Sequence, residues 1–343
     1  MAMDDAHVLA DAEWLAHRYI ESEDRVRFVR LARTRHGSVP FLTDACLGDY
    51  GRGRDIEAQV CLRDATPGPL HFLFHSAFCG STMLVHAFDR PGLAMGLSEP
   101  TIFNDVVGFR RRGAQPRAVA RAADVATRLT ARSFAPNEAV IVKPSNVANP
   151  LAELLLALRG EARAVFLYAP LETFLISVAR KGLECRLWAR ELADGYLTDD
   201  YLSPLGLTPH DVLRQSDLQV AAAGWLAQHA HFAQLAAKLG PDRLRSLDCN
   251  SLTADPSAAL VAVARHYGLG LDDTAVAQIV AGPAFTQHSK SGAAYSADAR
   301  TADYAAARAA HRDEIAMVVV WTEAVAANAG IALRGPSPLL GDD

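Results

Sequence analysis

Three short apolar runs in the chain are each followed by a small-residue turn and then by a helical pattern. These runs are LHFLF from Leu70, EAVIVK from Glu138 and RAVFLY from Arg163. Buried strands that alternate with helices form parallel sheets, and ligands of such sheets bind at the carboxyl ends of the strands. The pattern therefore predicts an α/β fold in which helices flank a parallel β-sheet.

Breaks in this pattern predict the domain organisation. The first part of the chain combines a predicted helix, DAEWLAHRYI from Asp11, with a Gly/Arg-rich turn, GDYGRGRD from Gly48. We expect an N-terminal extension packed on the core over residues 1–69, an α/β domain over 70–335 and a loose tail over 336–343. The later segments predict a further strand, RLRSLDC, and helices over residues 210–240, 255–268 and 303–329.

Charge and cysteine usage exclude several function classes. The formal net charge of -5 argues against a surface that follows nucleic-acid phosphates, so an anion site must be local. The five cysteines form no CxxC pair, which argues against zinc ribbons and dense disulfides and favours a reducing cytoplasm. The N-terminus has no apolar core of a secretory signal. The apolar stretch from Ala316 contains Glu323 and Asn328, so it predicts a buried amphipathic helix rather than a membrane span.

The segment FHSAFCGSTML after the first run has the composition of a phosphate-binding loop, which makes the predicted sheet P-loop-type. Small side chains let backbone amides approach an anion, and the following helix points its N-terminus at that anion. The residues predicted to make these contacts are Ser76, Cys79, Gly80, Ser81 and Thr82. In the pattern GxxxxGK[ST], His75 replaces the first glycine and Ser81 replaces the lysine, so ATP hydrolysis is not expected. The alternative is a small-residue turn that needs no ligand.

Several separated segments together resemble one family, the bacterial sulfotransferase-family proteins that use 3'-phosphoadenosine 5'-phosphosulfate. The segments that carry the resemblance are FCGSTML, LSEPTIF, AVIVKPSNVANPLAELL, AVFLYAPLETFLISVARKG and PDRLRSLDCNSLTADPSAALVAVARHYGL. Their joint order and spacing, from Leu70 to the C-terminus, are more specific than any single motif. The resemblance implies a sulfotransferase-like fold and a transfer of a sulfuryl group from this donor to a hydroxyl or amine acceptor, with no metal required.

The resemblance also implies roles for individual residues. Glu99 matches the catalytic glutamate of tyrosylprotein-type members, which implies that it removes the proton of the acceptor. Lys143 matches the lysine of the KTH motif of cytosolic members, which implies that it neutralises the bridging oxygen of the leaving nucleotide. A lysine at the end of an apolar strand is itself costly unless its ammonium reaches a partner. Ser177 matches a serine that contacts the 3'-phosphate of the donor, and Arg180 and Lys181 follow it by one turn.

The sequence departs from the family pattern where two positive charges are expected. Phe78 and Cys79 occupy the positions of the cation that many members place before GST, and Ala169 occupies the position of an arginine. A multiply anionic donor needs cations close to it. The residues that are candidates to replace these charges are Lys143, Arg180, Lys181 and Lys290.

Alternative interpretations remain open. Glu99 could lie in the first turn of a helix capped by Ser98. The whole chain could be a small-molecule kinase on the same scaffold, or a nucleotide-binding module without catalytic activity. The expected partners are the nucleotide donor and an acceptor of unknown identity, and neither the acceptor nor the oligomeric state follows from the sequence.

Overall fold

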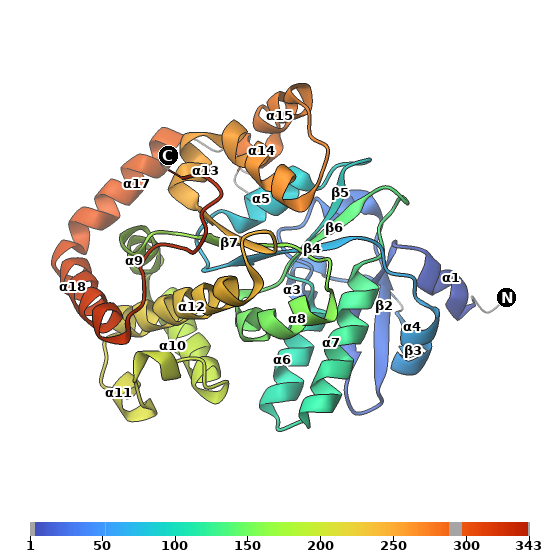
Figure 1. Cartoon of the computed structure of the whole chain (residues 1–343), viewed down its shortest axis with the longest axis horizontal. Helices are drawn as coiled ribbons and strands as arrows, with labels where there is room; N and C mark the ends of the chain where they lie inside the picture. The colour runs from blue at the N-terminus through green and yellow to red at the C-terminus, as the bar shows by residue number, and fades with distance from the viewer. Residues whose placement is uncertain (1–3, 52, 288–296, 342–343) are drawn as a thin grey trace. The chain divides into compact units, whose positions relative to one another are not determined.

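The computed structural model of the protein describes residues 4–51, 53–287 and 297–341. Within these residues the strands form two sheets, a three-stranded sheet of order β1-β2-β3 and a five-stranded sheet of order β5-β6-β4-β7-β8 (Figure 1). The strands are β1 (Trp14–Ile20), β2 (Arg25–Arg30), β3 (Arg54–Glu57), β4 (Leu70–His75), β5 (Ala94–Ser98), β6 (Ala139–Lys143), β7 (Ala164–Tyr168) and β8 (Leu244–Asp248).

Helices connect and surround these strands. Up to β7 they are α1 (Asp5–Ala10), α2 (Arg33–His36), α3 (Asp44–Leu47), α4 (Ala58–Asp64), α5 (Ser81–Phe88), α6 (Thr101–Arg111), α7 (Pro116–Thr130), the 3-10 helix η1 (Asn146–Leu151) and α8 (Ala152–Leu158). After β7 they are α9 (Leu171–Arg180), α10 (Gly182–Thr198), η2 (Ser203–Leu205), α11 (Pro209–Leu213), α12 (Asp217–Leu239), α13 (Cys249–Ala254), α14 (Pro256–Tyr267), α15 (Asp273–Val280), α16 (Pro283–Thr286), α17 (Ala297–Ala310) and α18 (Arg312–Ala329).

The five-stranded sheet is the parallel sheet that the apolar runs predict. Both β4 and β5 pair with β6 in the parallel sense, and Ser98 lies opposite Lys143 in the register. All residues of β4, β5, β6 and β7 are buried, which is typical of a parallel sheet covered by helices on both faces. The predicted α/β fold is therefore confirmed, and the carboxyl ends of β5 and β6 lie level with each other.

The described residues divide into two compact units. The first comprises residues 4–74, 81–164 and 263–287 and contains the three-stranded sheet together with β5, β6 and all but the last residue of β4. The second comprises residues 75–80, 165–262 and 297–341 and contains β8 and all but the first residue of β7. The domain boundaries expected from the sequence stay a prediction.

The prediction of a helix from Asp11 is wrong, because Trp14–Ile20 forms the strand β1. This strand pairs with β2 in the antiparallel sense, and the pairing register shifts between Ala16 and Arg18. The shift is a β-bulge, which brings consecutive side chains into buried positions. The first four residues of β1 are all buried. This bulge removes the two-residue alternation by which a strand is recognised in a sequence.

A glycine allows α5 to pack closely on β5 in the first unit. A Cβ atom on Gly96 would lie 2.7 Å from the carbonyl oxygen of Val85 and 3.1 Å from the Cβ of Asp89. The Gly96 amide also donates a hydrogen bond of 3.2 Å to the Asp89 carboxylate at the end of α5. The helix that follows the predicted phosphate loop is therefore fixed against the strand that leads to Glu99.

Arg132 ties the N-terminal segment to the rest of the first unit. Its buried guanidinium donates hydrogen bonds to the carbonyl oxygens of Val8 at 2.9 Å, Leu9 at 3.1 Å and Trp14 at 2.5 Å. Burial lowers the pKa of this guanidinium to about 10. Because the group remains charged at neutral pH, each of these carbonyl groups receives a charge-assisted hydrogen bond.

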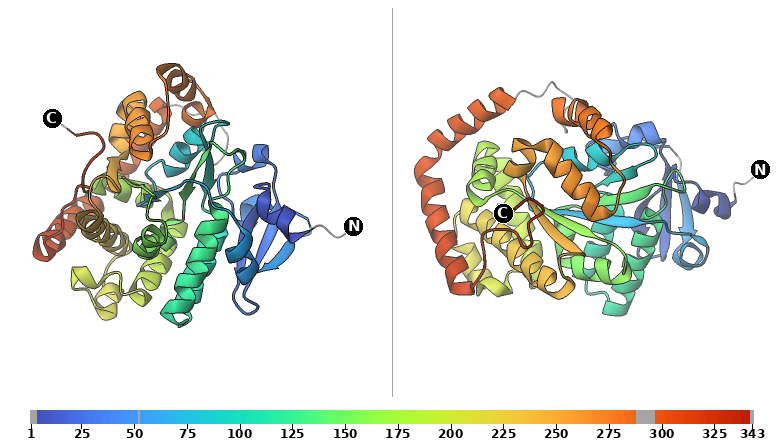
Figure 2. Two further views of the ribbon diagram at one scale, coloured as in Figure 1. Left: turned by 45° about the vertical axis from the view of Figure 1, so that its right-hand side comes forward. Right: turned by 45° about the horizontal axis from the view of Figure 1, so that its top comes forward.

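Two of the long helical patterns predicted in the second unit are each divided into two helices. Ser216 and Gln219 form a capping box that starts α12 at Asp217, so α11 and α12 are separate. His311 separates α17 from α18, and Figure 2 shows these two helices following one another near the C-terminus. The helix predicted from Ala316 is part of α18, but it is only partly buried, because Met317 and Val320 are largely exposed. Within the described ranges, we find no helix that combines the length and the apolar character required to span a membrane.

Candidate active site

The loop between β4 and α5 has the compact backbone that the small-residue pattern predicts. Three residues of this loop have positive φ angles, namely Ala77 at 72°, Phe78 at 52° and Gly80 at 80°. The Ser76 hydroxyl accepts a hydrogen bond of 3.1 Å from the Ala169 amide and fixes the loop to the end of β7. Within the described residues, the amides of Phe78 and Gly80 donate no hydrogen bond. These two amides are therefore available to an anion, as in other backbone anion sites.

A lysine reaches the loop where the sequence lacks the expected cation. The Lys181 Nζ lies 5.5 Å from the centroid of the Phe78 ring, within the range of a cation–π interaction. The ring also contacts Trp188, at 5.4 Å between centroids, and Phe174, at 5.9 Å. All of these residues belong to the second unit, so the structure brings together Phe78 and the predicted site residue Lys181.

Glu99 and Lys143, the two predicted catalytic residues, form an ion pair in the first unit. The Lys143 Nζ lies 2.5 Å from the Glu99 Oε1. The Lys143 side chain is fully buried, whereas the Glu99 side chain is 19% exposed. A buried ammonium is stable only with such a partner, so the pairing explains how an apolar strand ends in a lysine. The carboxylate reaches the surface and the ammonium lies behind it.

The backbone of Glu99 excludes the alternative in which this residue begins a helix. Its φ angle is 50°, in the left-handed region, and its amide donates a hydrogen bond of 2.7 Å to the Lys143 carbonyl. The helix α6 starts at Thr101 with Pro100 at its N-cap. Ser98 ends β5, and its hydroxyl donates to the carbonyl of Pro40 at 2.7 Å. A non-glycine residue in a left-handed conformation is uncommon and is often found at functional sites.

Two residues near this ion pair were not predicted from the sequence. The Phe41 ring centroid lies 5.1 Å from the Lys143 Nζ. His86, on α5, has its pKa lowered to about 4, mainly by burial and also by the positive charge of Lys143. His86 is therefore neutral at physiological pH. In the sequence, His86 is marked only by its position one to two helical turns after the GST segment.

Ser177 and Arg180, predicted to bind the 3'-phosphate, both contact α17. The Ser177 hydroxyl donates to the Thr173 carbonyl at 2.9 Å, which is the back-bond expected of a serine inside a helix. The Ser177 and Tyr304 hydroxyl oxygens also lie 2.6 Å apart. The Arg180 guanidinium lies 3.3 Å from the Asp303 carboxylate and 5.2 Å from the Tyr304 ring centroid. The side chains predicted to bind the 3'-phosphate thus interact with polar side chains of α17.

The remaining predicted site residues are placed as follows. Cys79 is buried in the loop, and Ser81 and Thr82 are the first residues of α5. Lys290 lies outside the described residues. Ala169 is fully buried at the end of β7, and its carbonyl accepts a hydrogen bond of 2.9 Å from the Trp225 indole. In the part of the chain that the structure describes, no group of three or more His, Cys, Asp or Glu side chains is arranged to hold a metal ion.

Comparison with known proteins gives similarity at the level of structure. No protein-family model matches the chain, and no curated protein matches it. The sulfotransferase domain from the curacin biosynthetic pathway is similar with a TM-score of 0.43 and 13% identity over 78% of this chain and 99% of that domain. A sulfotransferase from Mycobacterium avium is similar with a TM-score of 0.44 and 11% identity over 73% of this chain and 78% of that protein. At these identities the similarity concerns the fold alone.

Proposed function

We propose that the protein transfers a sulfuryl group from 3'-phosphoadenosine 5'-phosphosulfate to a hydroxyl or amine acceptor. The observation that carries the proposal is the ion pair between Glu99 and Lys143 at the carboxyl ends of two neighbouring parallel strands. Ligands of parallel sheets bind at this edge. Both residues also match catalytic positions in the family that the sequence resembles.

The reaction needs three contributions from the protein. An acceptor oxygen or nitrogen attacks the sulfur, a bond forms between them, and the bond from sulfur to the bridging phosphate oxygen breaks. Glu99 takes the proton that the acceptor loses, because its carboxylate is the exposed member of the ion pair. We assign to Lys143 the stabilisation of the negative charge that develops on the bridging oxygen as adenosine 3',5'-bisphosphate leaves, and this role requires the ammonium to move out from its buried position behind the Glu99 carboxylate. We assign no step to a metal ion.

We assign the phosphates of the donor mainly to residues of the second unit. The amides of Phe78 and Gly80 are assigned to the 5'-phosphosulfate, with Lys181 supplying positive charge from its position over the Phe78 ring. Ser177 and Arg180 are assigned to the 3'-phosphate. Cys79, Ser81 and Thr82 complete the proposed loop, and Lys290 is assigned to the same donor from the sequence alone.

The donor class and the cysteines favour a cytoplasmic location. All five cysteines lie in the described part of the chain, and no disulfide joins them. Thiols persist in reducing compartments. We therefore propose that the protein acts in the cytoplasm.

Thermal-shift titration of the purified chain tests the proposed donor. Adenosine 3',5'-bisphosphate, ATP with magnesium, and AMP are compared, because a ligand that binds the folded state raises its melting temperature. The proposal expects the largest shift with adenosine 3',5'-bisphosphate, since only this ligand carries a 3'-phosphate. A larger shift with ATP favours the kinase alternative, and no shift with any of the three contradicts a donor site. Transfer of radiolabelled sulfate from the donor to small phenols then tests catalysis.

A further inference from the structure

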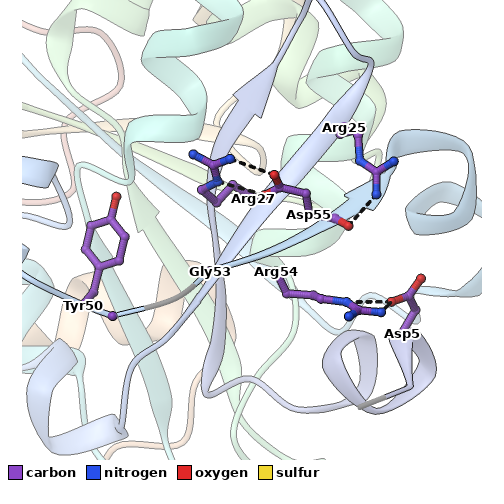
Figure 3. A pocket seen from close by; sticks show the side chains of 8 residues that line it. Asp5, Arg25, Arg27, Tyr50, Gly53, Arg54 and Asp55 are labelled. Atoms are coloured by element: carbon purple, nitrogen blue, oxygen red, sulfur yellow. Dashed lines mark hydrogen bonds and ion pairs between the residues drawn. The ribbon is translucent and has the colours of Figure 1, made fainter. Parts of the chain in front are cut away.

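The Gly/Arg-rich segment GDYGRGRD takes no part in the proposed function, yet it lines a pocket in the first unit. The pocket has a volume of about 620 Å³ and lies beside β2, β3 and the residues Tyr50, Gly51 and Gly53 (Figure 3). It is lined by Asp5, Arg25, Arg27, Tyr50, Gly51, Gly53, Arg54 and Asp55. A volume of this size accommodates a ligand of nucleotide or sugar-phosphate size.

Three arginines and two aspartates give the pocket lining a net positive charge. Arg27 forms a two-pronged interaction with the Asp55 carboxylate, at 2.8 Å and 2.7 Å. Arg54 donates to one oxygen of Asp5, at 3.2 Å from Nε and 2.9 Å from Nη2. Figure 3 shows these two pairs on neighbouring parts of the lining. Each carboxylate therefore forms an ion pair with one arginine, and the third arginine forms no such pair, although it contributes to the lowered pKa of Asp55.

Arg25 is this third arginine. Among the described residues its guanidinium makes one hydrogen bond, of 2.7 Å, to the backbone carbonyl of Asp55. A guanidinium has five N–H donors in a planar fork that matches the oxygens of phosphate and carboxylate groups. The Nη1 atoms of Arg27 and Arg54 likewise have no hydrogen-bond partner within the described residues. The lining thus presents unused donors from three side chains.

Two features hold the pocket in this shape. A Cβ atom on Gly53 would lie 2.9 Å from the Phe28 carbonyl oxygen, so the segment can approach β2 this closely only with glycine at this position. The Tyr50 hydroxyl donates to the Asp44 carboxylate at 3.1 Å, and the Tyr50 ring packs edge-on against His17. Tyr50, which also lines the pocket, is therefore fixed by residues outside it.

We propose that this pocket binds a small organic phosphate through Arg25, with Arg27 and Arg54 contributing further hydrogen bonds. The phosphate group lies against the unused N–H donors, and the organic part lies toward the Tyr50 ring. This binding site is separate from the proposed donor residues and does not depend on the proposed function. Arg52 falls in the same sequence segment but lies outside the described residues.

Isothermal titration of the full chain with ribose 5-phosphate and with inorganic phosphate tests the proposal. We expect saturable binding of ribose 5-phosphate that Arg25→Gln weakens at least about tenfold, since charge-assisted hydrogen bonds are lost. Arg30→Gln is the matched control, because Arg30 is an exposed arginine on the same strand and pairs with Glu13 outside the pocket. Equal affinity for the two probes means that the phosphate group alone is recognised, and tighter binding of the ester means that the organic part is recognised too.

Three outcomes overturn the proposal. The first is an absence of binding by the unaltered chain at millimolar probe, and the second is an equal affinity of the Arg25→Gln and Arg30→Gln variants. The third is a loss of binding in Lys181→Ala without a loss in Arg25→Gln, which places the anion at the donor loop. If Arg25→Gln does not fold, Arg25→Lys serves instead, because it keeps the charge and removes the planar fork. The Arg25→Lys variant is also expected to bind ribose 5-phosphate more weakly than the Arg30→Gln variant does.

Discussion

Lys143 and Glu99 are joined twice, once through their side chains and once through their backbones. The ammonium and the carboxylate are 2.5 Å apart, and the Glu99 amide donates to the Lys143 carbonyl at 2.7 Å. The backbone bond continues the pairing of β5 with β6 beyond the end of β5. The two side chains are consequently held by the sheet itself, which is the rigid kind of support that a catalytic pair requires.

This relationship predicts that Glu99→Gln lowers both the turnover and the stability of the protein. We expect turnover to be abolished, because an amide cannot take the acceptor proton, while affinity for adenosine 3',5'-bisphosphate is retained. We also expect the free energy of unfolding to fall by about 1–3 kcal/mol, because the buried ammonium loses the negative charge of its partner. The partial exposure of the Glu99 side chain limits this loss. Sulfate-transfer assays and urea denaturation measure the two effects.

The double variant Glu99→Gln/Lys143→Met provides the check on stability. Removing both charges restores part of the lost stability if the ion pair is the cause, and a double-mutant cycle isolates the coupling between the two side chains. Glu161→Gln, at an exposed glutamate, is the control. Undiminished turnover in Glu99→Gln would remove this residue from the mechanism.

A second prediction concerns Lys181. Lys181→Ala removes the cation above the Phe78 ring, so we expect affinity for adenosine 3',5'-bisphosphate to fall about tenfold. Because this nucleotide has no sulfuryl group, the loss reports on its phosphates. Lys238→Ala removes an exposed lysine at the end of α12 and is the matched control. Equal affinities of the two variants, measured by titration calorimetry, contradict a role for Lys181 in donor binding.

The sequence predicted those parts of the fold in which one local pattern dominates. β4, β6 and β7 are continuous apolar runs and were all identified. β5, with the sequence AMGLS, was not identified, because Ala94 and Gly96 have weak strand preference and the burial of the strand depends on neighbours distant in sequence. β1 was mistaken for a helix because its bulge conceals the alternation.

The same distinction applies to the candidate site. Lys143 and Glu99 were singled out separately, but their contact depends on β5 and β6 being neighbours, which strand order decides and local pattern does not. The contact between Ser177 and Tyr304 joins residues 127 positions apart, and nothing in the helical pattern around Tyr304 indicates it. The pocket at Arg25 depends likewise on the pairing of β2 with β3.

A third prediction follows from the contact between Arg180 and α17. The Asp303 carboxylate competes with a phosphate for the Arg180 guanidinium, from which it lies 3.3 Å away. We therefore expect Asp303→Asn to bind adenosine 3',5'-bisphosphate more tightly, by about twofold to fivefold, since the exposed pair is itself weak. Asp313→Asn, at an exposed aspartate of α18, is the control. Weaker binding in Asp303→Asn shows instead that the carboxylate supports the site.

A fourth prediction concerns the dependence of stability on pH. Burial lowers the pKa of His229 from 6.5 to about 3 and that of His71 to about 4. Below about pH 6.5 the unfolded chain binds protons at these rings and the folded chain does not, so the free energy of unfolding falls as the pH falls from about 6.5 toward 4. Each ring contributes a slope of up to about 1.4 kcal/mol per pH unit.

Urea denaturation at about pH 7.5, 6 and 5 measures this slope. His229→Gln removes one titrating ring from the buried site beside Trp225, so we expect a shallower decline than in the unaltered chain. His210→Gln, at an exposed histidine, is the matched control and is expected to leave the slope unchanged. An identical slope in the His229→Gln and His210→Gln variants would mean that His229 does not remain neutral in the folded protein over this range. The acid sensitivity would then originate in other groups.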